Sequence, residues 1–190
     1  MNNNEDWSIV ESCLNGNREA YALLVTKYEK SVFNIVYRLT GTTEEAKDIT
    51  QDTFIKAYES LRQVNPEFKF SNWLFKIATN LCKDRIKKRK IPTVSLHECN
   101  YLFDQEISNK NKDSQLSYQD NLIPSDEQEQ VQRAISNLPF IYRRIVVLRY
   151  IQDLTYQEIA DILEMPLGRV KVQLHRAHKI LYDQLSDILK

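Results

Sequence analysis

Between Arg18 and Leu39, apolar side chains recur at steps of three and four residues, a spacing that places them on one face of an α-helix. The positions with this period are Tyr21, Leu24, Val25, Tyr28, Val32, Ile35, Val36 and Leu39. Glycine and proline, the residues that most often interrupt helices, number only 3 and 5 in 190 residues. The sequence therefore predicts an all-α protein whose first long helix, or pair of nearly continuous helices, ends at Gly41.

A second helix is predicted after Gly41, with Thr42 or Thr43 as its N-cap and Glu44 and Glu45 in the first turn, where the helix dipole favours acids. One face of this helix is polar and contains Asp48, Gln51, Asp52, Ile55 and Glu59, and the packing side contains Phe54, Ala57, Tyr58 and Leu61. The polar face is either solvated surface or a docking site for a basic partner helix. No metal site is predicted there, because no His or Cys lies nearby and no calcium-loop spacing is present.

The stretch 68–90, FKFSNWLFKIATNLCKDRIKKRK, combines aromatic and basic side chains. On a helix, one of its faces contains Trp73, Lys76, Asn80, Lys83 and Lys87, beside an apolar stripe of Leu74, Ile77, Ala78 and Leu81. Aromatic rings stack on unpaired bases, lysines and arginines neutralise phosphates, and an amide such as that of Asn80 can bond a base edge. The stretch therefore suits single-stranded or opening DNA, and the alternative is a solvated basic helix on an ordinary bundle.

The formal net charge is zero, but the charges are unevenly distributed. Residues 1–90 hold 15 basic and 12 acidic residues, residues 91–130 hold 2 and 8, and residues 131–190 hold 9 and 6. Residues 91–124 have no sustained apolar period and are rich in Asn, Gln, Ser and Asp, so they are predicted to form a flexible acidic linker. His97 and Cys99 lie close together in this linker, but two ligands are too few for a metal site.

A helix-turn-helix is predicted in the C-terminal part. A helix capped by Ser125 and another after Pro139 precede Thr155, which forms a capping-box pattern with Glu158 at the start of a short helix. The turn is EMPLG, residues 164–168, and residues 168–181 contain no acid. The second helix of such a motif enters the major groove of DNA. The alternative is an amphipathic helical hairpin with a basic face.

The segments YEKSVFNIVYRLTG, EEAKDITQDTFIKAYESL and FKFSNWLFKIATNLCKDRIKKRK, in this order, resemble domain 2 of the bacterial sigma factors of the extracytoplasmic-function group. In that family the second segment binds the clamp helices of the largest catalytic subunit of RNA polymerase. The resemblance implies that role for Asp48, Gln51, Asp52, Phe54 and Ile55.

The same resemblance implies that the third segment captures and melts the minus-ten promoter element. The residues concerned are Phe68, Phe70, Asn72, Trp73, Lys76, Asn80, Lys83, Asp84, Lys87 and Lys88. Melting requires only that the open strand is bound better than duplex, so neither catalytic residues nor a cofactor are expected. Stacking worth ~1–3 kcal/mol per base offsets the cost of unstacking.

The segment LPFIYRRIVVLRYIQDLTYQEIADILEMPLGRVKVQLHRAHKIL resembles domain 4 of the same group, which reads the minus-thirty-five element. The residues assigned by this resemblance are Arg149, Thr155, Tyr156, Gly168, Arg169, Lys171, Val172, His175, Arg176 and Lys179. Glu164 stands where such turns usually have glycine, so the turn either holds a left-handed residue or has another geometry. Arg169 and Val172 replace small polar residues, and Val172 can contact a thymine methyl group.

The resemblance also implies partners. Core RNA polymerase and promoter DNA are expected, together with an anti-sigma factor, often membrane-linked, and no small-molecule substrate. In the family the linker threads through polymerase channels, and Asp104, Glu106, Asp113 and Asp120 are its candidate contacts. Cys13, Cys82 and Cys99 are isolated and predicted to be reduced thiols, and no signal peptide or membrane span is predicted, so a cytoplasmic protein is expected.

The prediction as a whole is a sigma factor of two small helical domains, residues 1–90 and 125–190, joined by the linker 91–124. One alternative is a free-standing helix-turn-helix regulator that binds duplex operators as a dimer. Another is a metal-dependent nuclease that uses Glu44, Glu45, Asp48 and Asp52.

Overall fold

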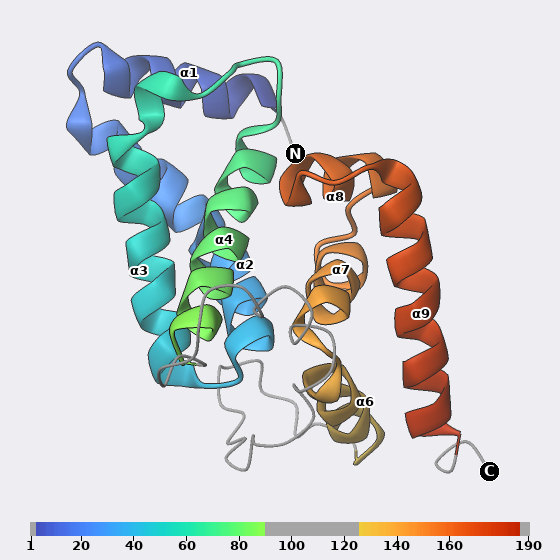
Figure 1. Cartoon of the computed structure of the whole chain (residues 1–190). Coiled ribbons are helices and arrows are strands. Elements are labelled where there is room, and N and C mark those ends of the chain that lie inside the picture. The colour runs from blue at the N-terminus through green and yellow to red at the C-terminus, as the bar shows by residue number, and fades with distance from the viewer. Residues whose placement is uncertain (1–2, 90–125, 187–190) are drawn as a thin grey trace. The chain divides into compact units, whose positions relative to one another are not determined.

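The computed structural model describes residues 3–89 and 126–186, and within these ranges the regular structure is helical. The described residues form two compact units, one built on the helices up to Arg89 and the other on the helices from Asp126 onward (Figure 1). The predicted all-α fold with two small helical domains is confirmed. Several predicted features lie outside the described residues, namely the linker 91–124 with His97, Cys99, Asp104, Glu106, Asp113 and Asp120, and the cap Ser125.

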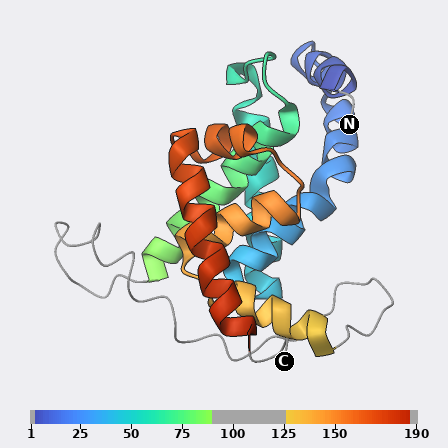
Figure 2. The ribbon, with the colours of Figure 1, turned by 90° about the vertical axis from the view of Figure 1, so that its right-hand side faces the viewer.

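The first unit contains the helices α1 (Asn3–Leu14), α2 (Tyr21–Thr40), α3 (Thr43–Glu59) and α4 (Phe70–Arg89), with short 3-10 turns at Arg18–Ala20 and Leu61–Gln63. Helices α2, α3 and α4 pack against one another, and α1 lies across one end, against α2 and α4 (Figures 1 and 2). The core that they enclose includes Leu24, Tyr28, Ile35, Leu39, Ile49, Phe70 and Leu74. The apolar period of the sequence therefore predicted the buried face of α2 correctly.

Two helix ends of this unit follow from local chemistry. Gly41 ends α2 with a φ of 85°, a left-handed conformation that glycine adopts without strain, and its N–H donates to the Tyr37 carbonyl at 2.8 Å. Thr42 is the N-cap of α3, but its hydroxyl makes no capping bond to the backbone and lies 3.5 Å from a Glu45 carboxylate oxygen. The predicted start of α3 is confirmed in position, whereas the capping hydrogen bond is absent.

Helix α1 is not among the elements predicted from the sequence. Its inner face is built from Asp6, Val10 and Cys13, and Asp6 is only 2% exposed. A buried carboxylate interrupts the apolar pattern that would mark a helix, and its partners lie about twenty residues away, on α2. Asp6 accepts hydrogen bonds from the Tyr28 hydroxyl at 2.5 Å and the Lys27 Nζ at 2.6 Å.

The second unit contains α6 (Asp126–Asn137), α7 (Phe140–Tyr150), α8 (Tyr156–Leu163) and α9 (Leu167–Leu185). Helix α9 packs against α6 and α7. Arg143 is buried at the junction of α6 and α7, where its guanidinium donates to the Leu138 carbonyl at 3.0 and 3.3 Å. Burial lowers the pKa of Arg143 to about 10, so it remains charged at neutral pH and caps the end of the preceding helical segment.

Candidate functional site

The polar side of α3 is exposed along its whole length. Its members are Asp48, Gln51, Asp52, Ile55 and Glu59, called the α3 face below. Ile55 is 50% exposed in the middle of this face, with acidic and amide side chains on either side of it. An apolar side chain surrounded by acids is the composition expected of a surface that a basic, partly apolar helix covers.

Phe54 does not belong to this face. It is 7% exposed and packs in the core, while its backbone carbonyl accepts a hydrogen bond from the Tyr21 hydroxyl at 2.8 Å. The assignment of Phe54 to polymerase contact therefore needs correction, because its side chain is not available to a partner. Its neighbour Ile55 supplies the exposed apolar group instead.

The C-terminal end of α4 lies beside α3 and is tied to it by ion pairs. Arg89 binds Glu45, and an Arg85 nitrogen lies 4.0 Å from an Asp52 oxygen. These pairs are at the surface, where each is worth ~0–1 kcal/mol. Lys87 and Lys88 are exposed on the same last turns.

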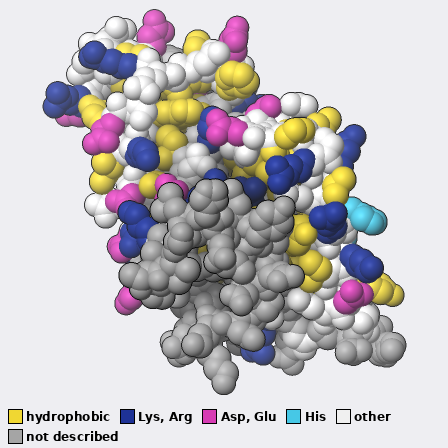
Figure 3. Space-filling view, in the orientation of Figure 1, with side chains coloured by type: hydrophobic (Ala, Val, Ile, Leu, Met, Phe, Trp, Pro, Cys, Tyr) yellow, Lys and Arg dark blue, Asp and Glu magenta, His cyan; other side chains and the backbone are white. Residues whose placement is uncertain are grey.

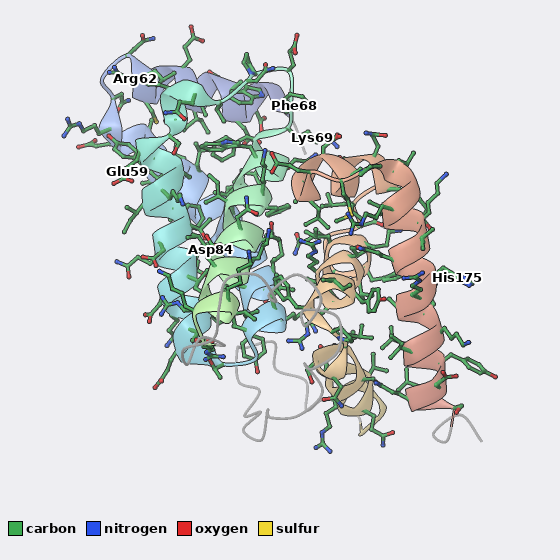
Figure 4. All side chains as sticks on the ribbon, in the orientation of Figure 1. Glu59, Arg62, Phe68, Lys69, Asp84 and His175 are labelled. Atoms are coloured by element: carbon green, nitrogen blue, oxygen red, sulfur yellow. The ribbon has the colours of Figure 1, made fainter. Side chains whose placement is uncertain are left out.

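The aromatic cluster ahead of α4 divides into a core part and an exposed part. Phe68 is 52% exposed at the end of the loop that joins the Leu61–Gln63 turn to α4, and Figure 4 shows it with Lys69 at that end of the unit. Phe70 is fully buried, with ring centroids 5.7 Å from Tyr28, 5.5 Å from Trp73 and 6.2 Å from Trp7. The assignment of Phe70 to DNA is therefore corrected, because its ring is in the core and fixes the start of α4.

The remaining predicted minus-ten residues lie on α4 and differ in exposure. Asn80, Asp84, Lys87 and Lys88 are exposed, and Asn72, Trp73, Lys76 and Lys83 are half-buried. The buried side of α4 consists of Phe70, Leu74, Phe75, Ala78, Thr79 and Cys82. The buried residues recur at steps of three and four, so they lie on one side of α4. The polar and basic residues lie on the other sides of the helix.

The helix-turn-helix is formed by α8, the turn at residues 164–166 and α9. At the start of α8, Glu158 Oε2 accepts from the Thr155 N–H at 2.8 Å, and the Glu158 N–H donates to the Thr155 hydroxyl at 3.3 Å. The predicted capping box is confirmed. Ile159 and Ala160 on α8 are buried, as the packing of a short helix in this motif requires.

Glu164 occupies the turn in a left-handed conformation, with a φ of 51°. The Met165 N–H donates to the Ala160 carbonyl at 3.0 Å, and the Glu164 N–H approaches the Asp161 carbonyl at 3.4 Å. This pair of bonds is the Schellman pattern that closes a helix, in which the left-handed position is usually glycine. Of the two turn geometries that the sequence left open, the structure has the left-handed one.

The outer face of α9 is basic. Its exposed residues are Gly168, Arg169, Lys171, Val172, His175, Arg176, His178 and Lys179, and the buried ones are Val170, Gln173, Leu174 and Ala177. Figure 3 shows a histidine among lysine and arginine side chains along this helix, and Figure 4 shows His175 directed away from the helix into solvent. Val172 is 51% exposed in the middle of this face.

Three further predicted DNA contacts lie at the end of α7 and the start of α8. The guanidinium of Arg149 donates to the Leu154 carbonyl at 2.8 Å and lies 5.3 Å from the centroid of the Tyr156 ring. The Thr155 hydroxyl donates a hydrogen bond to Glu158 Oε2 at 2.8 Å. Arg149 therefore holds the turn between α7 and α8 in addition to carrying charge at this surface.

The described residues were also compared with the requirements of a metal site and of a reactive thiol. Among the described residues, no group of three or more His, Cys, Asp or Glu side chains could hold a metal ion. Cys13 and Cys82 are free thiols, and burial raises the pKa of Cys82 to about 12, so it is protonated at neutral pH. In the same ranges, no helix is both long enough and apolar enough to cross a membrane.

Trp7 is not among the site residues predicted from the sequence. Its indole N–H donates to the Phe68 carbonyl at 3.2 Å, which joins α1 to the loop ahead of α4. The only signal in the sequence is the weak spacing of Trp7, Val10 and Leu14, which does not identify a partner 61 residues away.

Comparisons with known proteins agree on one family. A profile of Sigma-70 region 2 matches residues 24–91, and a profile of Sigma-70, region 4 matches residues 128–181. The chain is similar to the ECF RNA polymerase sigma factor SigW of Bacillus subtilis, with 35% identity over 91% of this chain and 92% of SigW. It is also similar to the ECF RNA polymerase sigma-E factor of Escherichia coli K12, with 28% identity over 97% of this chain and 96% of that protein.

Two solved structures share the fold. CnrH in complex with the cytosolic domain of CnrY has a TM-score of 0.67 and 20% identity, covering 94% of this chain and 96% of CnrH. The sigma factor RpoE of Bartonella quintana, in complex with the anti-sigma factor NepR, has a TM-score of 0.67 and 17% identity, covering 87% of this chain and 96% of RpoE. At these identities the structures show a common all-helical architecture.

Proposed function

The chain belongs to the extracytoplasmic-function group of the sigma-70 family, and we propose that its two units divide promoter recognition between them. As a sigma factor it directs RNA polymerase to promoters and is a regulator rather than an enzyme. In the proposed division, the first unit binds core polymerase and opens the minus-ten element, and the second unit binds the minus-thirty-five element. The proposed place of action is the cytoplasm, where polymerase and chromosome are found.

Core polymerase is proposed to bind the α3 face. The observation that carries the proposal is the exposed Ile55 among Asp48, Gln51 and Asp52, on the same unit as an exposed aromatic residue and basic side chains. A regulator that only binds duplex DNA does not need an exposed acidic face with an apolar side chain in its middle. The acids would steer a basic partner helix, and burial of Ile55 would supply affinity.

The Phe68 loop and the exposed positions of α4 are proposed to bind the opened minus-ten element. Phe68 offers a ring face to an unpaired base, Asn80 offers an amide, and Lys87 and Lys88 offer charge to phosphates. Stacking of one base contributes ~1–3 kcal/mol, which is the order of the cost of unstacking it. Strand opening is therefore driven by binding free energy.

The exposed face of α9 is proposed to enter the major groove at the minus-thirty-five element. Lys171, Val172, His175 and Arg176 lie on that face and are the candidates for base contacts. The candidates for phosphate contacts are Arg149 near the end of α7 and Thr155 and Tyr156 at the start of α8.

An anti-sigma factor is the proposed third partner. Both solved relatives named above were determined as complexes, CnrH with the cytosolic domain of CnrY and RpoE with the anti-sigma factor NepR. A protein that covered the α3 face or the basic surfaces would compete directly with polymerase or promoter.

Run-off transcription with purified core polymerase tests the proposed polymerase contact. The test variant carries Asp48→Ala, Asp52→Ala and Ile55→Ala, which remove two acids and one exposed aliphatic side chain. The matched control carries Glu19→Ala, Leu23→Ala and Glu29→Ala, which remove the same groups elsewhere on the first unit, where Leu23 is 60% exposed. We expect wild-type and control proteins to give discrete start sites, and the α3 variant to bind polymerase at least ~10-fold more weakly, about 1.4 kcal/mol.

Two outcomes would count against the proposal. If the α3 variant binds polymerase with unchanged affinity, polymerase docks on another surface of the protein. If the wild-type chain supports no initiation and instead protects duplex operators as a dimer, the free-standing regulator is the correct alternative.

A further inference from the structure

Helix α1 precedes the part of the chain that matches Sigma-70 region 2, which begins at residue 24, yet it contacts the loop proposed to capture DNA. We propose that Trp7 is a positioning residue that holds the backbone of Phe68 so that its ring is presented to an unpaired base. This inference rests on the proposed minus-ten role of Phe68.

Trp7 makes two contacts at the junction of the loop and α4. Its indole N–H donates to the Phe68 carbonyl at 3.2 Å, and its ring meets Phe70 edge to face, with centroids 6.2 Å apart and an interplanar angle of 86°. Phe70 is fully buried, so the ring of Trp7 rests on a fixed surface. Trp7 therefore links the exposed residue of the junction, Phe68, to its buried residue, Phe70.

The position of α1 is itself fixed from α2. Asp6, the neighbour of Trp7, is 2% exposed and accepts hydrogen bonds from the Lys27 Nζ at 2.6 Å and the Tyr28 hydroxyl at 2.5 Å. A buried carboxylate with two such donors is costly to displace, because it would lose both its ion pair with Lys27 and the hydrogen bond from Tyr28. The register of α1 over the bundle, and with it the position of Trp7, is set by this anchor.

The loop is also shaped from its other side. The Asn65 side-chain oxygen accepts from the Glu67 N–H at 2.9 Å, and the Phe68 N–H lies 3.3 Å from the Asn65 carbonyl. Phe68 thus has its N–H held by the turn and its carbonyl held by Trp7, while its ring is 52% exposed. Fixing the backbone before DNA arrives reduces the entropy lost on binding, which is how a hydrogen bond remote from the ligand can strengthen recognition.

The test compares Trp7→Phe, Phe68→Ala and the double variant as holoenzymes with core polymerase. Trp7→Phe retains an aromatic ring against Phe70 and removes the N–H donor. Tyr21→Phe is the matched control, since it removes another side-chain donor to a backbone carbonyl, that of Phe54, in the same unit. Opening is measured by permanganate reactivity of minus-ten thymines, on a promoter mapped by run-off transcription, at saturating concentrations of each sigma protein.

We expect Trp7→Phe to reduce the fraction of open promoter, with an equilibrium effect of roughly fivefold, the size of one lost hydrogen bond. Polymerase affinity and the urea midpoint of the first unit should stay within the range of the Tyr21→Phe control. In the Phe68→Ala background, Trp7→Phe should have no further effect, because Trp7 acts through the ring of Phe68.

The remaining outcomes overturn the inference in distinguishable ways. If Phe68→Ala impairs opening and Trp7→Phe does not, the minus-ten role of the loop stands and the positioning role of Trp7 is wrong. If Trp7→Phe has the same effect with or without the Phe68 ring, Trp7 supports the fold alone. If Phe68→Ala opens promoters normally, the proposed function of the loop fails and the inference fails with it.

Discussion

Glu164 shows how much a single position can matter to the helix-turn-helix. It has a φ of 51° at the closing position of α8, where the Met165 N–H reaches back to the Ala160 carbonyl at 3.0 Å. A side chain with a Cβ in this conformation costs ~1–2 kcal/mol relative to the right-handed region. The turn is nevertheless formed, with the buried Ile159 and Ala160 of α8 before it and the buried Val170 and Leu174 of α9 after it.

Glu164→Gly should therefore stabilise the second unit. We expect a gain of ~0.5–1 kcal/mol, because glycine relieves the left-handed strain but loses some of that gain to its greater freedom in the unfolded chain. Hydrogen exchange of the buried amides of α8 and α9 in the full chain should slow by about two- to fivefold. Asp161→Gly, a substitution inside α8, is the control and should accelerate exchange, so slower exchange in both variants would contradict the explanation.

Helix α9 has an apolar side chain and basic side chains on the same exposed face. Val172 is 51% exposed and lies between basic neighbours, while Lys179 lies two turns further along the helix. If this face enters the major groove, an apolar side chain in its middle contributes to base preference and a lysine towards its end contributes charge.

Val172→Ala and Lys179→Ala should therefore have different effects on promoter choice. Val172→Ala is expected to reduce discrimination at one minus-thirty-five position by ~1 kcal/mol, about fivefold, because a thymine methyl loses its apolar contact. Lys179→Ala is expected to weaken binding equally on all sequences. Selection of holoenzyme-bound promoters from a library randomised at the minus-thirty-five element separates the two, and a uniform loss with Val172→Ala would contradict base contact.

For the whole molecule, a formal net charge of zero conceals basic surfaces on both units. Lys87 and Lys88 are exposed at the end of α4, and Arg176 and Lys179 are exposed on α9. Each phosphate that such a residue neutralises releases counterions, so the logarithm of promoter affinity falls linearly with the logarithm of salt concentration. Each contact adds ~0.7 to the magnitude of the slope on single strands and ~0.9 on duplex.

The salt dependence of holoenzyme binding to promoter should therefore become weaker with each lysine that is removed. Lys179→Ala should reduce the magnitude of the slope by up to ~0.9, and Lys87→Ala by up to ~0.7, with the two reductions additive in the double variant. Lys30→Ala on the exposed side of α2 serves as the control and should leave the slope unchanged. A slope that is the same in all variants would show that these lysines do not contact phosphates.

The sequence determined most of the helices, one capping box and the polarity of the helix faces, because these depend on residues three or four positions apart. The period of α2, the end at Gly41 and the Thr155–Glu158 capping box were all predicted from such spacing. The exposed faces of α3 and α9 followed for the same reason, since a helix that buries one stripe must expose the opposite one.

Only the tertiary structure decided which aromatic residues are available to a partner. Phe54 and Phe70 belong to the core, whereas Phe68 is exposed, and their local sequence does not distinguish them. Helix α1 was missed for a related reason, because its buried Asp6 is stabilised by Lys27 and Tyr28, which are distant in sequence. Burial and hydrogen bonding between distant segments depend on the packed fold, so spacing along the chain cannot predict them.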